Sequence, residues 1–208
     1  MKQWLLTGYE LLTVLAPCTV VYVLTRVRDK RCGQENGISV WQLALLLGYL
    51  FGMLHVTGAG TLSDVQWYGL EWNPAQVNLL PFSQGIDPTG HLLNIVLFLP
   101  LGVLLPAFCR KWDSVRCVAA CGLLVSLVIE LSQLLNNRRT DVDDLLLNAL
   151  GAVLGLLLFR IVSYFFKRGT GQKNGCARDL MLCAAAAFVG RFLLFDEMGA
   201  AGRLFEFY

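Results

Sequence analysis

The stretch "RRTDVDDLLLNALGAVLGLLLFRIVSYFF", residues 138–166, joins a charged start to a long apolar run. Between residues 145 and 166 the only charged side chain belongs to Arg160. A helix rises about 1.5 Å per residue, so roughly 20 apolar residues cross a hydrocarbon core about 30 Å thick. The stretch therefore predicts a transmembrane helix that begins at a charged rim.

The whole chain has the composition of a membrane protein. Its 208 residues are 56% hydrophobic and 15% charged, with a mean hydropathy of +0.57, which is too apolar for an ordinary soluble domain. We expect an all-α polytopic protein with about six spans in a single membrane domain over residues 1–208. The last span is short, so five spans remain an alternative. The predicted spans are 4–24, 40–55, 91–109, 118–135, 145–166 and 180–195.

The distribution of basic residues predicts the orientation of these spans. The segments that follow the first, third and fifth spans hold eleven Lys and Arg residues, against four on the opposite side. Cytoplasmic loops carry the excess of Lys and Arg. The sequence therefore predicts that both termini are extracytoplasmic. Trp67, Tyr68 and Trp72, in the long loop 56–90, are expected at the outer headgroup level.

Three predicted spans carry polar residues within about 8 Å of their outer ends, at ~1.5 Å per residue. Polar side chains inside a membrane are costly, so they are functional-site hypotheses by default. Residues three or four apart share one face of a helix, which groups these side chains into stripes. The stripes are His91 and Asn94; Ser126, Glu130 and Gln133; and Asp141, Asp144 and Asn148.

Structural roles compete with functional ones for several of these residues. Asp141 is suited to capping the fifth span, with Asp143 and Asp144 in the first helical turn. Arginines at positions 138 and 139 can extend into lipid headgroups. Glu130 resists a purely structural interpretation best, because a buried carboxylate needs a partner. The candidate partners are Arg138, Arg139 and Arg191.

A pair of small residues predicts close helix packing below the polar stripe of the fifth span. Gly151 and Gly155 are four residues apart, a spacing that lets another backbone approach. We expect the neighbouring helix to be the fourth span, 118–135. Asn148 would then be pressed against that helix.

Four segments in order make residues 78–159 resemble the VanZ-like family. They are "NLLPF" at 78–82, "NIVLFLPLG" at 94–102, "SLVIELSQ" at 126–133 and "RRTDVDDLLLNALGAVLG" at 138–155. The resemblance implies a multi-pass protein of the bacterial cytoplasmic membrane, in a family whose type member is associated with teicoplanin resistance. The positions that carry the family pattern are Asn78, Pro81, Phe82, Asn94, Glu130, Gln133, Arg138, Asp141, Asp144, Asn148 and Gly151.

Three functions remain open on the sequence. The first is a non-enzymatic glycopeptide resistance factor, whose outer pocket binds a cell-envelope component or the lipoglycopeptide itself. The second is an intramembrane enzyme for a lipid-linked envelope substrate, and the third, ranked last, is a transporter. Membrane lipid, a lipid-linked precursor or a lipoglycopeptide are the expected partners, and no nucleic-acid motif is present.

Candidate site residues follow from these hypotheses. In the enzyme hypothesis Glu130 is the general acid or base, Arg138 binds phosphate or carboxylate, and Asp141 and Asp144 hold a divalent cation. The metal and any other cofactor stay unassigned. The binding residues expected for the outer pocket are Asn78, Phe82, His91, Asn94, Gln133 and Asn148.

Overall fold

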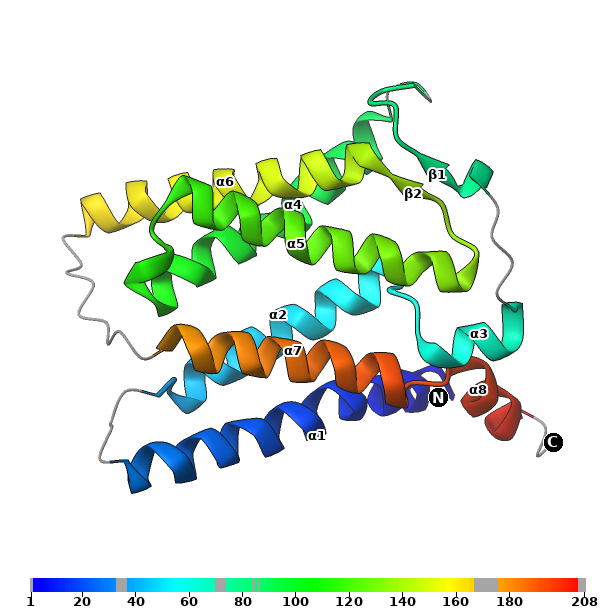
Figure 1. The fold of residues 1–208 in the computed structure, drawn as a ribbon, viewed down its shortest axis with the longest axis horizontal. Helices are drawn as coiled ribbons and strands as arrows, with labels where there is room; N and C mark the ends of the chain where they lie inside the picture. The colour runs from blue at the N-terminus through cyan, green and yellow to red at the C-terminus, as the bar shows by residue number, and fades with distance from the viewer. Residues whose placement is uncertain are drawn as a thin grey trace. The chain divides into compact units, whose positions relative to one another are not determined.

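The computed structural model of the chain describes residues 2–32, 37–69, 74–83, 85, 87–166 and 176–205. These residues form helices joined by short turns, with one two-stranded pairing (Figure 1). Within them, five helical stretches are long and apolar enough to cross a membrane. The chain is therefore an all-α polytopic membrane protein, as the sequence predicts.

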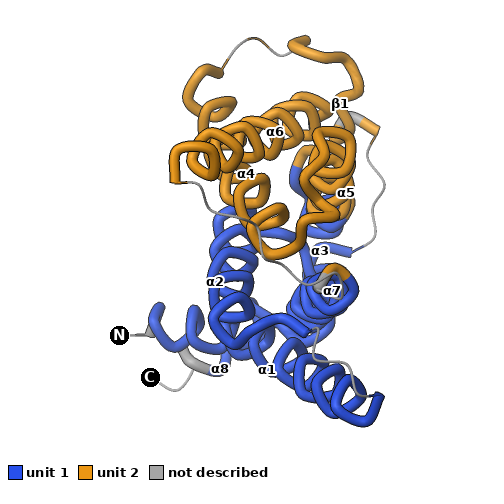
Figure 2. The backbone as a smooth tube through the Cα atoms, turned by 90° about the vertical axis from the view of Figure 1, so that its left-hand side faces the viewer, with its two compact units in different colours: residues 1–73, 132–138, 178–208 blue, residues 74–131, 139–177 orange. Residues whose placement is uncertain are grey.

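The chain divides into two compact units (Figure 2). Unit 1 contains the N-terminal helices and the C-terminal segment, and unit 2 contains most of the middle of the chain. Residues 71 and 72 of the expected interfacial loop, and the predicted basic segment 167–175, lie outside the described residues. Unit 1 is Met1–Asn73, Ser132–Arg138 and Arg178–Tyr208; unit 2 is Pro74–Leu131 and Arg139–Ala177.

Unit 1 is built on long helices whose ends are capped. Ser39 opens α2 by accepting a hydrogen bond from the Gln42 backbone N–H, and Gly58 closes it with φ 58°. That left-handed backbone favours glycine. The elements of unit 1 are α1 (Lys2–Arg31), α2 (Val40–Thr57), α3 (Leu62–Tyr68), η3 (Leu134–Asn136), most of α7 (Cys176–Leu194) and α8 (Glu197–Phe205).

Helix α7 runs antiparallel to α1. Arg178 at its start is paired with Asp29 at 2.9 Å, and Arg191 near its end is paired with Glu10 at 2.8 Å. Helix α7 covers most of the predicted sixth span, although it is not among the five helices that meet the length and apolarity required for a span. The basic cluster that the sequence placed in a loop after residue 24 is helical, because α1 continues to Arg31.

Unit 2 is a helical bundle with a short parallel strand pair at one end. Asn78 pairs with Asp141 in register, and Val77 pairs with Thr140. Its elements are η1 (Pro74–Gln76), β1 (Val77–Asn78), α4 (Pro88–Phe108), η2 (Arg110–Trp112), most of α5 (Val115–Gln133), β2 (Thr140–Asp141) and α6 (Val142–Phe165). The pairing of β1 with β2 holds the "NLLPF" segment against the start of α6.

Glycines bring α6 and α4 into backbone contact. A Cβ added at Gly151 would lie 2.3 Å from the Ile95 carbonyl oxygen, and one at Gly155 would lie 2.0 Å from that of Leu99. The prediction that these glycines pack against the helix of residues 118–135 is therefore wrong, because they pack against α4. Helix α5 instead packs on α6 through Gly122, where an added Cβ would lie 3.2 Å from the Ala149 Cα.

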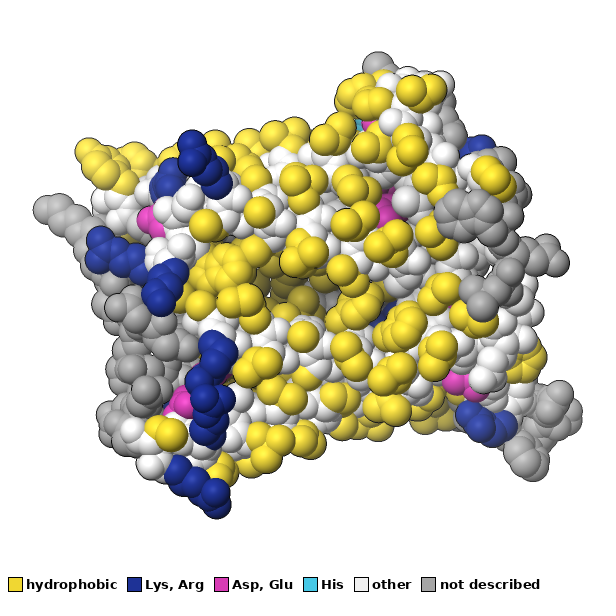
Figure 3. All heavy atoms as spheres, in the orientation of Figure 1, with side chains coloured by type: hydrophobic (Ala, Val, Ile, Leu, Met, Phe, Trp, Pro, Cys, Tyr) yellow, Lys and Arg dark blue, Asp and Glu magenta, His cyan; other side chains and the backbone are white. Residues whose placement is uncertain are grey.

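The flanks of the long helices are apolar and exposed (Figure 3). Hydrophobic side chains cover much of the face drawn, and most of its Lys and Arg side chains gather near its two ends. Leu24 is 63% exposed, Leu131 53% and Ile161 56%. Apolar surface on this scale marks a protein whose helices face lipid.

Candidate functional site

Asp141 holds two segments of unit 2 together. Its side chain accepts hydrogen bonds from the Asp143 backbone N–H and from Asn78 Nδ2, each at 3.0 Å. The first contact caps α6, with Asp143 and Asp144 in the first turn. The predicted helix cap is therefore confirmed, and the second contact adds a role in seating β1.

Glu130 is buried, with 3% of its surface exposed, and it faces the same segment. Its Oε2 accepts a hydrogen bond from the Asp141 backbone N–H at 3.3 Å, and its carbonyl oxygen accepts one from Thr140 at 3.0 Å. No ion pair in the described parts of the chain involves Glu130. Arg191, one of its candidate partners, is paired with Glu10 instead.

The remaining polar residues of unit 2 are also joined by side-chain contacts. Asn94 donates a hydrogen bond to Asp144, and Asn148 donates one to Ser126 of α5 at 2.8 Å. The contact of Asn148 with the fourth predicted span is thus confirmed. The ring of His91 lies edge-on to that of Phe82, with 6.1 Å between the centroids.

Asp143, which the sequence places in the first turn of a helix without a site role, is buried rather than part of a charged surface. Only 5% of its surface is exposed. Both of its carboxylate oxygens accept the Phe82 backbone N–H, at 3.0 Å each. Phe82 has φ 55°, a left-handed conformation that is uncommon for a non-glycine residue. Asp143 therefore fixes a strained turn of the "NLLPF" segment.

We call Glu130, Asp141, Asp143 and Asp144 the carboxylate cluster. Within the described residues, no three His, Cys, Asp or Glu side chains form a group that could hold a metal ion. Asp141 and Asp144 accept hydrogen bonds from Asn78 and Asn94 instead. The geometry of the cluster therefore supports a structural role more directly than the hypothesised divalent cation.

Gln133 and Arg138 belong to unit 1, where they close the end of α2. Gln133 Nε2 and Arg138 Nη1 both donate to the Thr57 carbonyl oxygen, at 2.7 and 2.6 Å. Asn136 Nδ2 donates to the Gly58 carbonyl oxygen at 3.0 Å. These donors satisfy carbonyl groups that the end of a helix leaves without partners.

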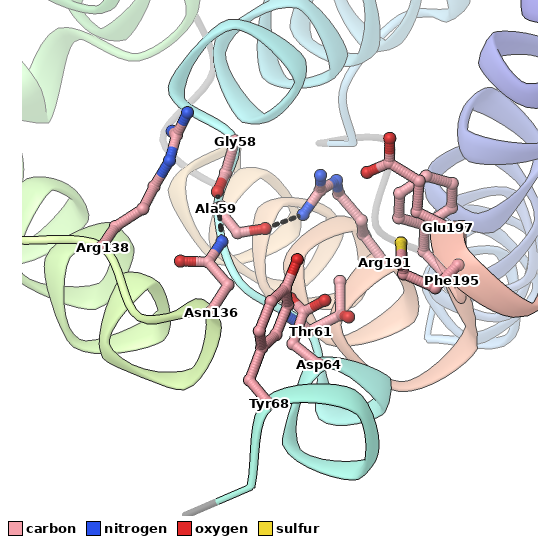
Figure 4. Close-up of a pocket in the computed structure, with 11 residues that line it drawn as sticks. Gly58, Ala59, Thr61, Asp64, Tyr68, Asn136, Arg138, Arg191, Phe195 and Glu197 are labelled. Carbon is pink, nitrogen blue, oxygen red and sulfur yellow. Dashed lines mark hydrogen bonds between the residues drawn. The ribbon is translucent and has the colours of Figure 1, made fainter. Parts of the chain in front are cut away.

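Arg138 also lines a cavity of about 260 Å³, which we call the arginine pocket (Figure 4). Its lining is largely polar and comes from segments that are distant in the sequence. The lining residues are Gly58, Ala59, Thr61, Asp64, Tyr68, Asn136, Arg138, Arg191, Phe195, Glu197 and Met198.

A buried ionic group supports one wall of the arginine pocket. Arg191 is 5% exposed; its Nε contacts Glu10 Oε1 at 2.8 Å, and Nη1 donates to the Ala59 carbonyl oxygen. The guanidinium also lies over the Phe195 ring, 5.1 Å from its centroid. Glu10 Oε2 contacts His55 Nδ1 at 2.6 Å.

Glu10, His55 and Arg191 were not predicted as site residues. A signal for them was present, since Glu10 and Arg191 are ionisable residues inside predicted spans and His55 ends one. Their mutual contacts depend on α1, α2 and α7 meeting in space. The sequence does not specify that meeting.

A family model matches most of the chain. The model described as VanZ/LLP1 matches residues 20–163, which is more than half of the 208 residues. The match includes the carboxylate cluster and Arg138, whereas Arg191 lies beyond it. No curated protein and no solved structure matches the chain. The protein belongs to the VanZ/LLP1 family.

Proposed function

We propose that this protein is a resistance factor of the bacterial cytoplasmic membrane that acts against teicoplanin-type glycopeptides. It does so by binding a cell-envelope component, or the lipoglycopeptide itself, at the extracytoplasmic surface. Family membership and the five apolar helices support this role. Teicoplanin-type drugs carry an acyl tail, so the drug and the protein would meet at the membrane surface.

The observation that carries the proposal is the position of Arg138 on a cavity wall. Of the four residues considered for catalysis, Arg138 alone is among the lining residues of this pocket. Glu130, Asp141 and Asp144 accept hydrogen bonds from protein donors in unit 2. A binding role therefore has more support than an enzymatic role based on those carboxylates.

The test compares Arg138→Gln with Arg139→Gln in a teicoplanin-susceptible host that expresses the protein. A charge-assisted hydrogen bond contributes about 1.5–3 kcal/mol, so its loss weakens binding roughly tenfold or more. We expect Arg138→Gln to lose most of the resistance. Arg139→Gln, a change at the adjacent position outside the lining, should keep it. Full resistance of Arg138→Gln at an equal amount of protein in the membrane would contradict the proposal.

Glu130→Gln separates the binding role from the enzymatic one. Glutamine keeps an oxygen that can accept the Asp141 N–H but removes the ionisable group. We expect this variant to retain most of the resistance. Its complete loss in a variant with wild-type thermal stability, together with conversion of a labelled lipid-linked precursor by the purified wild type, would favour the enzyme.

A further inference from the structure

The arginine pocket carries both signs of charge. Arg138 and Arg191 line it together with Asp64 and Glu197. Its volume of about 260 Å³ lies below the roughly 300–1,000 Å³ of sites for drug-sized molecules. The cavity therefore suits a small polar group, which can be one part of a larger envelope component.

Arg138 supplies a cation that is available for a ligand. It uses Nη1 on the Thr57 carbonyl oxygen, and no ion pair within the described residues involves it. A guanidinium has five N–H donors arranged in a plane, a geometry that matches phosphate oxygens. Arg191 adds a second guanidinium, already oriented by Glu10. These side chains fit a phosphate group.

The remaining walls fit a cation. Figure 4 shows Glu197 and Arg138 on opposite sides of the cavity, with the Tyr68 ring and Asp64 between them. Glu197 is exposed and makes no ion pair with a described residue, while one oxygen of Asp64 accepts the Thr61 N–H at 2.7 Å. Carboxylates beside aromatic rings attract ammonium groups. A ligand with a phosphate at one end and an amine at the other complements both walls.

Two ion pairs predict the depth of the pocket in a membrane. Among the described residues, α1 and α7 form two ionic contacts, the Glu10–Arg191 pair beside the pocket and the Asp29–Arg178 pair. Their positions on α1 differ by 19 residues, or about 28 Å at ~1.5 Å per residue. A hydrocarbon core is about 30 Å thick, so we expect one pair near each membrane surface and the pocket at the level of lipid headgroups.

We propose that the arginine pocket binds a phosphate ester that carries an amine, as in the headgroup of phosphatidylethanolamine. The Arg138 and Arg191 guanidinium groups take the phosphate, and Glu197, Asp64 and Tyr68 take the ammonium group. Free phosphoethanolamine shares this chemistry. The inference rests on the proposed function, because it names the class of envelope component that is bound.

The test is calorimetric titration of the purified full-length protein in a neutral detergent. The probes are dihexanoyl phosphatidylethanolamine, dihexanoyl phosphatidylglycerol and O-phosphoethanolamine. We expect saturable binding of the ethanolamine lipid, weakened at least about tenfold by Arg138→Gln. Glu197→Gln should remove the preference for the ethanolamine lipid over the glycerol lipid. Arg203→Gln, a change at an exposed arginine outside the lining, should bind as the wild type does.

Two controls show whether a change in binding comes from the pocket or from unfolding of the variant. Thermal unfolding establishes that each variant is folded, and Glu197→Gln provides a second variant at an exposed position if Arg138→Gln is unstable. Binding of O-phosphoethanolamine but not of the lipid supports the phosphate-amine chemistry and assigns it a soluble source. Equal binding of both lipids by the wild type, or unchanged binding by folded Arg138→Gln, overturns the inference.

The resistance assay keeps this inference distinct from the proposed function. If Arg138→Gln loses resistance while the wild type binds none of the three probes, the inference fails and the resistance role stands. If the wild type binds the ethanolamine lipid and Arg138→Gln keeps full resistance, the resistance role fails and the ligand class stands.

Discussion

At the scale of single residues, Asp143 shows how a charged side chain at the start of a helix takes a structural role. It lies in the first turn of α6, where the helix dipole favours a negative charge. Both of its oxygens also accept the backbone N–H of Phe82, which has positive φ. The carboxylate thus compensates for a backbone conformation that a phenylalanine rarely adopts.

Removing Asp143 should therefore loosen the "NLLPF" segment. Asp143→Ala leaves the Phe82 N–H without its protein acceptor. Because Phe82 is exposed, we expect a cost of about 0.5–1.5 kcal/mol, the net contribution of a typical hydrogen bond. Asp143→Asn keeps one acceptor oxygen and should cost less. Thermal unfolding of the purified protein in detergent measures the difference. If Asp143→Ala unfolded at the wild-type temperature, the anchoring role would be wrong.

The Glu10–Arg191 pair gives a second test at this scale. Arg191→Met leaves buried Glu10 without its arginine partner, and breaking a buried pair from one side costs roughly 3–5 kcal/mol. The double variant Glu10→Gln with Arg191→Met removes both charges and should recover part of that loss. Chemical unfolding of both variants checks this, and a double variant less stable than Arg191→Met would oppose the assignment.

At the scale of elements, apolar runs predicted five helices within a few residues: α2, α4, α5, α6 and α7. The 145–166 run lies within α6 except for its last residue, and the Asp141 cap was predictable because capping depends on local sequence. The continuation of α1 to Arg31 was missed, because a basic cluster ends an apolar run without ending a helix. The pairing of β1 with β2 was also missed, since it joins two residues to two others about 60 positions away.

The glycines of α6 show what helical periodicity leaves open. Their spacing predicted a close approach, yet a glycine face does not specify which helix packs against it. Gly151→Ala and Gly155→Ala would each push a methyl group into a carbonyl oxygen of α4. We expect each to destabilise the protein by about 1–3 kcal/mol in unfolding measurements, the range for overpacking.

Gly48→Ala is the matched control for this packing. Gly48 lies inside α2, and a Cβ added there would meet nothing within 4 Å. Alanine has the higher helix propensity, so this variant should be as stable as the wild type or more stable. Equal stability of all three alanine variants would contradict the close contact of α4 with α6.

At the scale of the whole molecule, the arginine pocket was only partly predictable. Arg138 was a candidate because it lies in the charged segment before an apolar run and, unlike Arg139, carries the family pattern. Asp64, Arg191 and Glu197 come from α3, α7 and α8, and no local pattern brings these elements to one cavity. The carboxylate cluster was easier to predict from the sequence, because Asp141, Asp143 and Asp144 fall within four consecutive residues.

The proposed function requires that the pocket end of unit 1 faces the outside of the cell. The other end of unit 1 holds the C-terminal end of α1, and the basic residues there predict that it is cytoplasmic. Gln66 on α3 and Cys32 after α1 are both exposed, so they report on the two ends of unit 1. A Gln66→Cys variant can be compared with native Cys32, each as the single cysteine of the chain.

The decisive measurement is labelling of these two single-cysteine proteins in intact cells with a membrane-impermeant maleimide. We predict that the cysteine at position 66 reacts in intact cells, and that Cys32 reacts only after the cells are permeabilised. Reaction of Cys32 in intact cells, with position 66 protected until permeabilisation, would place the arginine pocket in the cytoplasm and contradict the proposed action at the outer surface.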